Sequence, residues 1–391
     1  MPHFSPVFAQ VMSLLHPQAF QRCVEQHPFK RKPRGLSAYD HFLALCFAQL
    51  TYRESLRDIE ACLNARAGLT YPLGFRGHIT RTNLAYANEH RDWRLFAEVA
   101  QVLMRRAQRL YQTEPVDADW PALTFALDST LIHLSAQLFP WAVGGGPRRP
   151  TAVKLHVLLN LRGHHPAWAA MSRVQVPDLK MLDVLPVEPG GCYILDRGYV
   201  DYSRLYAITT QQAWFVVRSR KRISSYVAGS QPVDKTTGLR SDQIIRLNHR
   251  RHKAHYPEPL RRIRLYDDQQ HRSLVFLTNN FHLPAATIAQ LYKQRWQVEL
   301  FFKWIKQHLR LRAFLGKTPN AVQCQLWSAI CSYLLVAILK KELKLHHSLH
   351  EILQILSIHP FEQTPITELI TRNTPETTPA QNQKLFEFNH L

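Results

Sequence analysis

The chain has 391 residues, of which 46% are hydrophobic and 20% are charged. It carries 49 Lys and Arg residues against 29 Asp and Glu residues, a formal net charge of +20, with a pI near 9.9. This excess predicts a polyanionic partner, either nucleic acid or an anionic membrane surface. We expect no membrane attachment, because the longest apolar run, 329–339, is too short to span a bilayer and the first residues lack a signal-peptide pattern.

Six cysteines lie inside apolar stretches and form no CxxC pair or other zinc spacing: Cys23, Cys46, Cys62, Cys192, Cys324 and Cys331. This pattern is typical of buried free thiols in a reducing compartment. We therefore expect a cytoplasmic protein without disulfides.

Residues 1–115 predict an all-helical amino-terminal domain. Residues 39–50 are apolar at helical spacing, and Ser55 with Asp58 forms a capping-box pattern at the start of a second helix. A polar helix that begins near residue 82 follows. Two short helices before a polar one fit a helix-turn-helix in which Asn83 and Arg91 read bases. A plain helical bundle fits equally well, and both alternatives stay open.

From residue 116 the pattern changes to short apolar runs that are typical of buried strands. These runs are 124–127, 153–161 and 193–195, followed by a helical segment at 201–211. Asp128 and Asp196 each follow such a run directly. Residues 116–220 thus predict the first part of a layered α/β catalytic domain, with one acid at the end of each of two strands.

Residues 221–283 predict a β-rich insertion. Strand-like runs occur at 214–218, 243–247, 260–266 and 273–278. The densest basic clusters lie in and beside this segment and include Arg220, Lys221, Arg222, Arg250 and Arg251. A solvated β surface would alternate the sign of its charges. This one is almost entirely positive, so we expect a face that contacts DNA phosphates.

Residues 284–345 return to a helical pattern with a regular polar stripe. Tyr292, Arg295, Glu299 and Lys306 are spaced by three, four and seven residues, which places all four on one face of one helix. A capping-box pattern at 287–290 predicts the start of that helix. The alternative is a solvated helix face with ordinary i,i+4 ion pairs.

Two tryptophans on the same predicted helix, Trp296 and Trp304, are expected to pack in the core. Trp296 directly follows Arg295, so contact with a stacked base is the alternative. Residues 319–344 predict a core helix that is apolar on most faces. Residues 346–391 predict a short helix at 349–356 and a Thr/Pro-rich tail.

The spacing Tyr, two residues, Arg, three residues, Glu, six residues, Lys resembles the signature of bacterial insertion-sequence transposases of family four. Asp128 in LDST and Asp196 in LDRGY match the first and second acids of that family, and Glu299 matches the third. The resemblance covers nearly the whole chain.

The resemblance implies an α/β fold in which a ribonuclease-H-like core, interrupted by a β-rich insertion, follows an all-helical domain. The implied parts are a DNA-binding domain at 1–115, a catalytic domain at 116–220 and 284–345, the insertion at 221–283, and a carboxyl-terminal helix and tail at 346–391. It further implies a homodimer on double-stranded DNA, with the protein in the bacterial cytoplasm near the nucleoid. The DNA comprises terminal inverted repeats and target DNA.

Three carboxylates suit a magnesium site, since magnesium takes a few carboxylates together with water and substrate oxygens. We expect Asp128, Asp196 and Glu299 to hold two Mg²⁺ ions, with Mn²⁺ able to substitute, for two-metal phosphoryl transfer. Other acids compete for this role: Asp178, Asp183, Glu188 and Asp201.

We expect phosphate contacts from Tyr292, Arg295 and Lys306. The implied reaction cuts the ends of the element and joins the freed 3′ hydroxyls to target DNA. Alternatives are a ribonuclease-H-like nuclease without strand transfer and a non-catalytic DNA-binding regulator.

Overall fold

The structure is a computed structural model that describes residues 4–29, 35–114, 120–144, 150–219, 223–268, 271–309 and 313–372. The helices are α1 (Val7–Met12), α2 (Pro17–Gln26), α3 (Ala38–Leu50), α4 (Leu56–Asn64), α5 (Ala67–Thr70), α6 (Arg81–His90), α7 (Arg94–Tyr111), α8 (Tyr202–Thr210), α9 (Arg250–His255), α10 (Ala285–Lys293), α11 (Trp296–His308), α12 (Pro319–Glu342), α13 (Leu349–Ile358) and α14 (Ile366–Arg372). The strands are β1 (Leu123–His133), β2 (Ala152–Asn160), β3 (His165–Arg173), β4 (Gly191–Leu195), β5 (Trp214–Arg218), β6 (Ser225–Gln231), β7 (Leu239–Leu247), β8 (Leu260–Asp267) and β9 (Arg272–Thr278). Short 3₁₀ helices are η1 (Pro140–Ala142), η2 (Asp178–Asp183), η3 (Arg197–Tyr199) and η4 (Lys235–Thr237).

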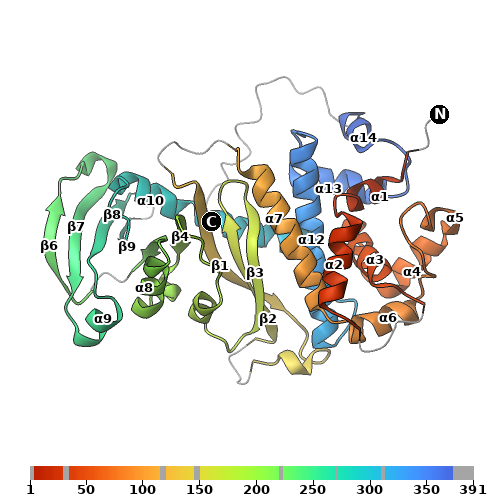
Figure 1. Ribbon diagram of the computed structural model, residues 1–391, viewed down its shortest axis with the longest axis horizontal. Helices are drawn as coiled ribbons and strands as arrows, with labels where there is room; N and C mark the ends of the chain where they lie inside the picture. Colours follow the sequence, from red (N-terminus) through yellow and green to blue (C-terminus); the bar gives the residue numbers. More distant parts are fainter. Residues whose placement is uncertain are drawn as a thin grey trace.

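Within these residues the strands form one nine-stranded sheet in the order β3-β2-β1-β4-β5-β9-β8-β7-β6. Strands β1, β2 and β3 pair antiparallel, β4 and β5 continue parallel to β1, and β9 pairs antiparallel with β5. The insertion is β-rich as predicted. It does not form a separate sheet, because β9 extends the edge that β5 provides, and β6–β9 lie at one end of the molecule (Figure 1).

The two strands that the apolar runs did not predict, β3 and β6, are the two edges of the sheet. An edge strand has a neighbour on one side only and needs fewer apolar side chains. The sequence of β6, SYVAGSQ, lacks an apolar run, and its side chains are mostly exposed. The tertiary position of these segments, rather than their composition, makes them strands.

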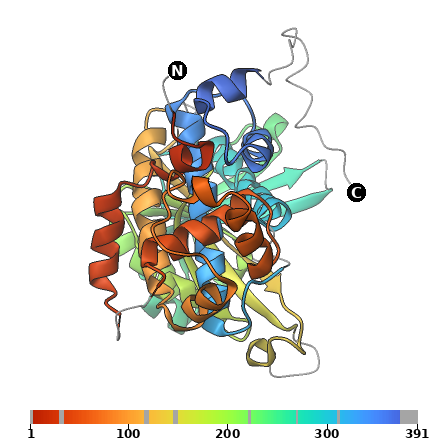
Figure 2. The ribbon, with the colours of Figure 1, turned by 90° about the vertical axis from the view of Figure 1, so that its right-hand side faces the viewer.

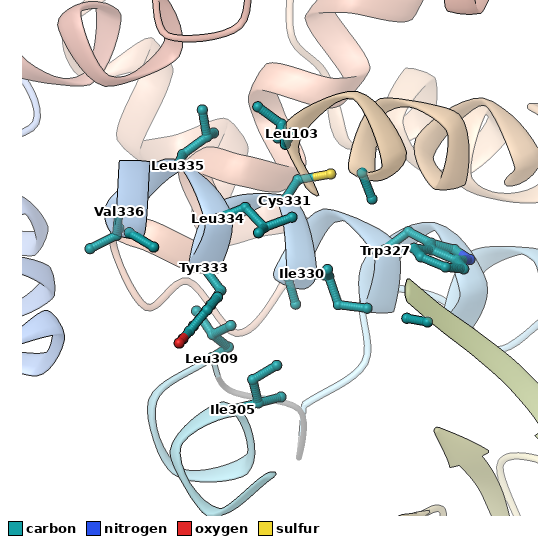
Figure 3. Packing of buried hydrophobic residues seen from close by; sticks show 14 of the residues in the cluster. Leu103, Ile305, Leu309, Trp327, Ile330, Cys331, Tyr333, Leu334, Leu335 and Val336 are labelled. Atoms are coloured by element: carbon teal, nitrogen blue, oxygen red, sulfur yellow. The ribbon is translucent and has the colours of Figure 1, made fainter. Parts of the chain in front are cut away.

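Helix α12 joins the helical part of the molecule to the sheet. Every described element between Val7 and Tyr111 is helical, and α3, α6 and α7 pack against α12, which also contacts β3. Leu103 of α7 and Ile305 of α11 lie beside α12, close to Cys331 and Tyr333 (Figure 3). The amino-terminal helices therefore share one core with α12, which lies in the predicted second part of the catalytic domain, residues 284–345. The predicted domain boundaries remain predictions.

Helix α12 is longer than the apolar run in the sequence. By length and composition it could cross a membrane, but 94% of its most apolar window is buried inside the protein. The figures show it surrounded by other elements (Figures 1 and 2). Burial on most faces explains why its hydrophobic residues show no single stripe. The six cysteines, all among the described residues, are free thiols, as predicted. Five are buried, whereas Cys62 is partly exposed.

Two expectations for the amino-terminal helices have different outcomes. Ser55 and Asp58 form the predicted capping box at the start of α4. Arg91 does not read bases, because it is only 4% exposed and donates hydrogen bonds to the carbonyl oxygens of Leu36 and Ser37 at 2.9 Å. Asn83 lies half-buried on α6.

At the carboxyl-terminal end, the predicted helix at 349–356 is α13. Helix α14 was not predicted, and the Thr/Pro-rich tail lies outside the described residues.

Acid should destabilise the fold through His41. This side chain is fully buried, its Nε2 lies 2.7 Å from Asn88 Oδ1, and burial, together with the Arg91 charge, lowers its pKa to about 3. The unfolded chain binds the proton near pH 6.5, so stability falls as the pH drops from 6.5 toward 3. In urea titrations across this window, His41→Gln should reduce the slope of unfolding free energy against pH by about 1.4 kcal/mol per unit. Equal slopes for the variant and the wild type would contradict this assignment.

Candidate active site

The first two acids are brought together by the pairing of β1 with β4. The parallel ladder ends at Leu127 opposite Leu195, so Asp128 and Asp196 are the next residues on neighbouring strands. Side chains alternate along a strand, and Ala126 and Ile194 face the core that contains α10 and α11. Asp128 and Asp196 follow two residues later and point to that same face.

Asp128 does not end its strand, contrary to the prediction. Strand β1 continues to His133 because β2 pairs with it along the whole segment, whereas β4 stops at Leu195. The apolar run in the sequence ends at Leu127, where the pairing with β4 ends, whereas β1 itself continues to His133. Asp128 is thus held by a rigid antiparallel pair, while Asp196 begins the turn into η3.

The four-residue signature lies on two helices rather than one. Helix α10 carries Tyr292, and α11 begins after Arg295 and carries Glu299 and Lys306. Between them the backbone bonds tighten to a three-residue spacing, with Arg295 N bonded to Tyr292 O and Val298 N bonded to Arg295 O. The predicted capping box at 287–290 is also wrong, since α10 begins at Ala285 after Pro284.

Helix α11 crosses β1 and β2, which brings its side chains to the two strand acids. Arg295 Nη1 donates to Asp128 Oδ2 at 2.5 Å, and Nη2 donates to Glu299 Oε1 at 2.6 Å. Tyr292 Oη donates to Asp196 Oδ1 at 3.1 Å. One guanidinium and one phenol therefore contact all three predicted acids. The solvated-face alternative fails for Arg295, whose side chain is 15% exposed.

Burial dominates the electrostatics of the site. It raises the pKa of Asp128 to about 6; Glu299 and Asp196 act in the same direction, and the Ser129 N–H and Arg295 oppose it. Burial disfavours the charge of Arg295, yet the facing Asp128 and Glu299 raise its pKa overall. Burial also raises the pKa of Tyr292 to about 12. The group at Arg295 stays charged, and the phenol of Tyr292 stays a donor.

The donor chemistry fits a hard divalent cation, because Asp128, Asp196 and Glu299 offer carboxylate oxygens only. Among the described residues, however, no group of three or more His, Cys, Asp or Glu side chains is arranged to hold an ion. The guanidinium of Arg295 lies between two of the three carboxylates and donates a hydrogen bond to each.

The competing acids all have other roles or places. Asp183 accepts two hydrogen bonds from Arg204, and Asp201 caps α8 and pairs with the same arginine. Asp178 lies 2.8 Å from Lys154 Nζ. Glu188 precedes β4, at the opposite end of that strand from Asp196.

The two tryptophans of α11 have different surroundings. Trp304 packs against Tyr333, with ring centroids 4.9 Å apart, so its core prediction is confirmed. Trp296 is 57% exposed, so its core prediction is wrong. Lys306 is half-buried two turns beyond Glu299, and burial lowers its pKa. No ion pair joins Lys306 to another described residue.

Of the basic residues predicted to contact DNA from the insertion, the structure describes two, Arg250 and Arg251. Arg220, Lys221 and Arg222 lie outside the described residues. Arg250 and Arg251 are exposed on α9, which packs with α8 on the face of the sheet opposite α10 and α11. These arginines and the three acids therefore lie on different faces of one sheet.

A buried ion pair that the sequence did not predict holds the segment before α10 in place. Arg261 of β8 donates to both carboxylate oxygens of Asp242 at 2.9 and 2.6 Å, and to the carbonyl oxygen of Leu283 at 2.5 Å. Both side chains are under 5% exposed. The available signal was an acid directly before the strand-like run 243–247 of the basic insertion. The pair ties the insertion to the segment that leads into Tyr292.

Residues 119–335 match the family model described as the transposase DDE domain, and residues 3–76 match a domain of unknown function. The chain is 34% identical over 259 residues to the y4zB protein of Sinorhizobium fredii, which its name describes as a transposase; the match covers 65% of this chain and 70% of that protein. It is 31% identical over 220 residues to a Geobacillus stearothermophilus protein named as the probable transposase for insertion sequence element IS5377. This match covers 54% of this chain and 55% of that protein. A piggyBac transposase solved in a synaptic complex with hairpin DNA covers 97% of this chain and 84% of its own at 9% identity and a TM-score of 0.44. The DDE-domain match spans all three acids.

Breaking the Arg261–Asp242 pair should strongly destabilise the protein. Asp242→Ala leaves a guanidinium buried without its partner, which costs about 3–5 kcal/mol in unfolding free energy. Glu98→Ala is the matched control, because its partner Arg105 is exposed and 3.7 Å away, and a surface pair contributes less than about 1 kcal/mol. Urea denaturation of both variants measures the difference. Similar losses in the two variants would show that the buried pair does not hold this segment.

Proposed function

This chain belongs to the transposases that carry a DDE domain, and we propose that Asp128, Asp196 and Glu299 are the three acids of that domain. The protein is a DNA transposase of an insertion sequence. The observation that carries the assignment is the convergence of β1, β4 and α11, where Arg295 and Tyr292 contact all three carboxylates. The strand order of β1–β5 also supports the finer proposal of a ribonuclease-H-like core.

A DDE transposase uses divalent metal ions, and we propose Mg²⁺, with Mn²⁺ as a substitute, because the donors are carboxylates alone. Two ions held by these acids would supply Lewis-acid stabilisation to the phosphate at which the bond breaks. In the proposed cleavage, a water oxygen bonds to phosphorus and the 3′ oxygen of the element leaves as a hydroxyl. In the proposed joining, that hydroxyl bonds to a target phosphorus and releases the 3′ oxygen of the target strand.

DNA is the partner, and we propose that the basic residues contact its phosphates. Tyr292, Arg295 and Lys306 would hold the cut end, with Arg295 able to contact a phosphate through two donors. Arg250 and Arg251, which are exposed on α9, would contact DNA on the other face of the sheet. Two terminal repeats must be handled together, so we propose a homodimer on the DNA. We further propose that the protein acts near the bacterial nucleoid.

Replacing any of the three acids should abolish cleavage. Asp128→Asn, Asp196→Asn and Glu299→Gln should each lower the rate by about a thousandfold or more, since each loses a metal ligand. Binding to the inverted repeats should persist, because the acids do not contact the duplex. A plasmid carrying the DNA that flanks the gene provides the substrate, with gel-shift binding as the second measurement.

Asp183→Asn is the matched control, because its carboxylate pairs with Arg204 rather than with the site. Near wild-type cleavage by any one of the three acid variants removes that residue from the site. Nicks without joined products in the wild type would favour the nuclease alternative over strand transfer.

Charge reversal on α9 should weaken DNA binding for every sequence alike. Arg250→Glu with Arg251→Glu removes two phosphate contacts, so the slope of log affinity against log salt should fall by about two. The matched control reverses Lys317 and Lys344, two exposed lysines outside the predicted DNA-binding domain and outside the insertion. Fluorescence anisotropy over a salt series gives both slopes. Lost discrimination between repeat and random DNA at unchanged affinity would mean that α9 reads bases instead.

A further inference from the structure

We propose that Arg295 is a latch that occupies the metal-binding position in the DNA-free enzyme and leaves it when the ions bind. The proposal rests on the assignment of Asp128, Asp196 and Glu299 as metal ligands. It adds that loading of metal and release of the arginine are one coupled event, and that the released guanidinium becomes the group that holds a DNA phosphate.

The geometry of Arg295 is that of a bridge. Its two terminal nitrogens bond to different carboxylates, at 2.5 Å to Asp128 Oδ2 and 2.6 Å to Glu299 Oε1. The other oxygen of Asp128 accepts from Ser129 N at 2.8 Å. Both oxygens of the first acid are thus engaged, one by the backbone and one by the latch.

A metal ion and the guanidinium cannot use the same oxygens. A magnesium ion lies about 2.0–2.1 Å from its ligand oxygens, and Asp128 Oδ2 is already in a close charged hydrogen bond. Two cations on one oxygen would also repel each other strongly in a partly buried site. An ion held by Asp128 and Glu299 would therefore require Arg295 to move.

The third acid is held differently. Asp196 accepts from the phenol of Tyr292, a neutral donor, at 3.1 Å. A neutral donor opposes an incoming cation much less than a guanidinium does. The barrier to metal loading thus lies at Arg295, and Tyr292 can remain in place.

Two features allow the latch to move. Arg295 lies at the tight turn between α10 and α11, where three-residue backbone bonds replace the regular helical spacing. Its Nε is buried and has no hydrogen-bond partner among the described residues, so the hydrogen bonds of the side chain come from the two terminal nitrogens. A phosphate near the acids would offer both nitrogens an alternative partner.

The test measures Mn²⁺ binding to the full chain by electron paramagnetic resonance, without DNA and at neutral pH. Arg295→Gln should bind Mn²⁺ about tenfold more tightly than the wild type, because the competing charged hydrogen bonds are gone. Lys303→Gln is the matched control: it removes one exposed positive charge from the same helix and should change the affinity by about twofold or less. Equal or weaker binding by Arg295→Gln than by Lys303→Gln overturns the latch.

A mixed-sequence duplex provides the second measurement. In the wild type the duplex should tighten Mn²⁺ binding, because phosphate draws Arg295 from the acids. This tightening should be clearly smaller in Arg295→Gln, where only direct contact of the ion with phosphate oxygens remains. Equal tightening in both proteins overturns the proposal. If Arg295→Gln does not fold in thermal denaturation, Arg295→Lys replaces it. That variant keeps the charge but loses the planar fork whose two terminal nitrogens each reach a different carboxylate. Its affinity should therefore exceed that of the wild type, and an unchanged affinity overturns the latch.

Asp128→Asn separates this proposal from the one on which it rests. The variant should lose Mn²⁺ binding if the acids hold the metal. Mn²⁺ binding that survives Asp128→Asn refutes the metal site and the latch together. Loss of binding in Asp128→Asn with unchanged binding in Arg295→Gln refutes the latch alone.

Discussion

The in-register parallel pairing of β1 with β4 is the constraint on which the candidate site depends. The ladder aligns Leu127 with Leu195, and this alignment makes Asp128 and Asp196 neighbours across two strands. A slip by one residue would turn one of these carboxylates to the opposite face of the sheet. The register is fixed by burial on both faces, since Ala126 and Ile194 belong to one core and their flanking residues to the other.

Three carboxylates close together in a partly buried place repel one another and lose hydration. The break between α10 and α11 supplies the compensation. It directs Tyr292 of α10 to Asp196 and Arg295, at the start of α11, to Asp128 and Glu299. A single straight helix would hold these groups at fixed rotation, whereas the tight turn between two helices lets each follow its own strand acid.

The site is also connected to the rest of the molecule through shared cores. Helix α12 packs against the amino-terminal helices and against α11, so these helices share one core. At the other end, Arg261 ties the insertion to the segment before α10. Packed interiors transmit displacement rather than absorb it. The positions of α10 and α11 therefore depend on packing from both ends of the protein.

The sequence by itself determined the family and the positive charge, and it led to the three proposed acids. These inferences rest on local patterns: the spacing of Tyr292, Arg295 and Glu299, and the apolar runs before Asp128 and Asp196. A local pattern can be read from the sequence without knowing which other elements pack against it. Only the tertiary structure decided where β1 ends, because its continuation past Asp128 depends on pairing with β2. It likewise decided which segments are edge strands, and that Arg91 lies in the core.

The split of the signature into two helices and the bridge from Arg295 were also decided by the fold. An arginine four residues before a glutamate is equally compatible with a solvated ion pair. What determines its role here is Asp128, a residue 167 positions away in the chain, which β1 places against the same guanidinium. Sequence spacing reports neighbours along one element, and a site built from two strands and two helices is fixed by the register and packing that bring those elements together.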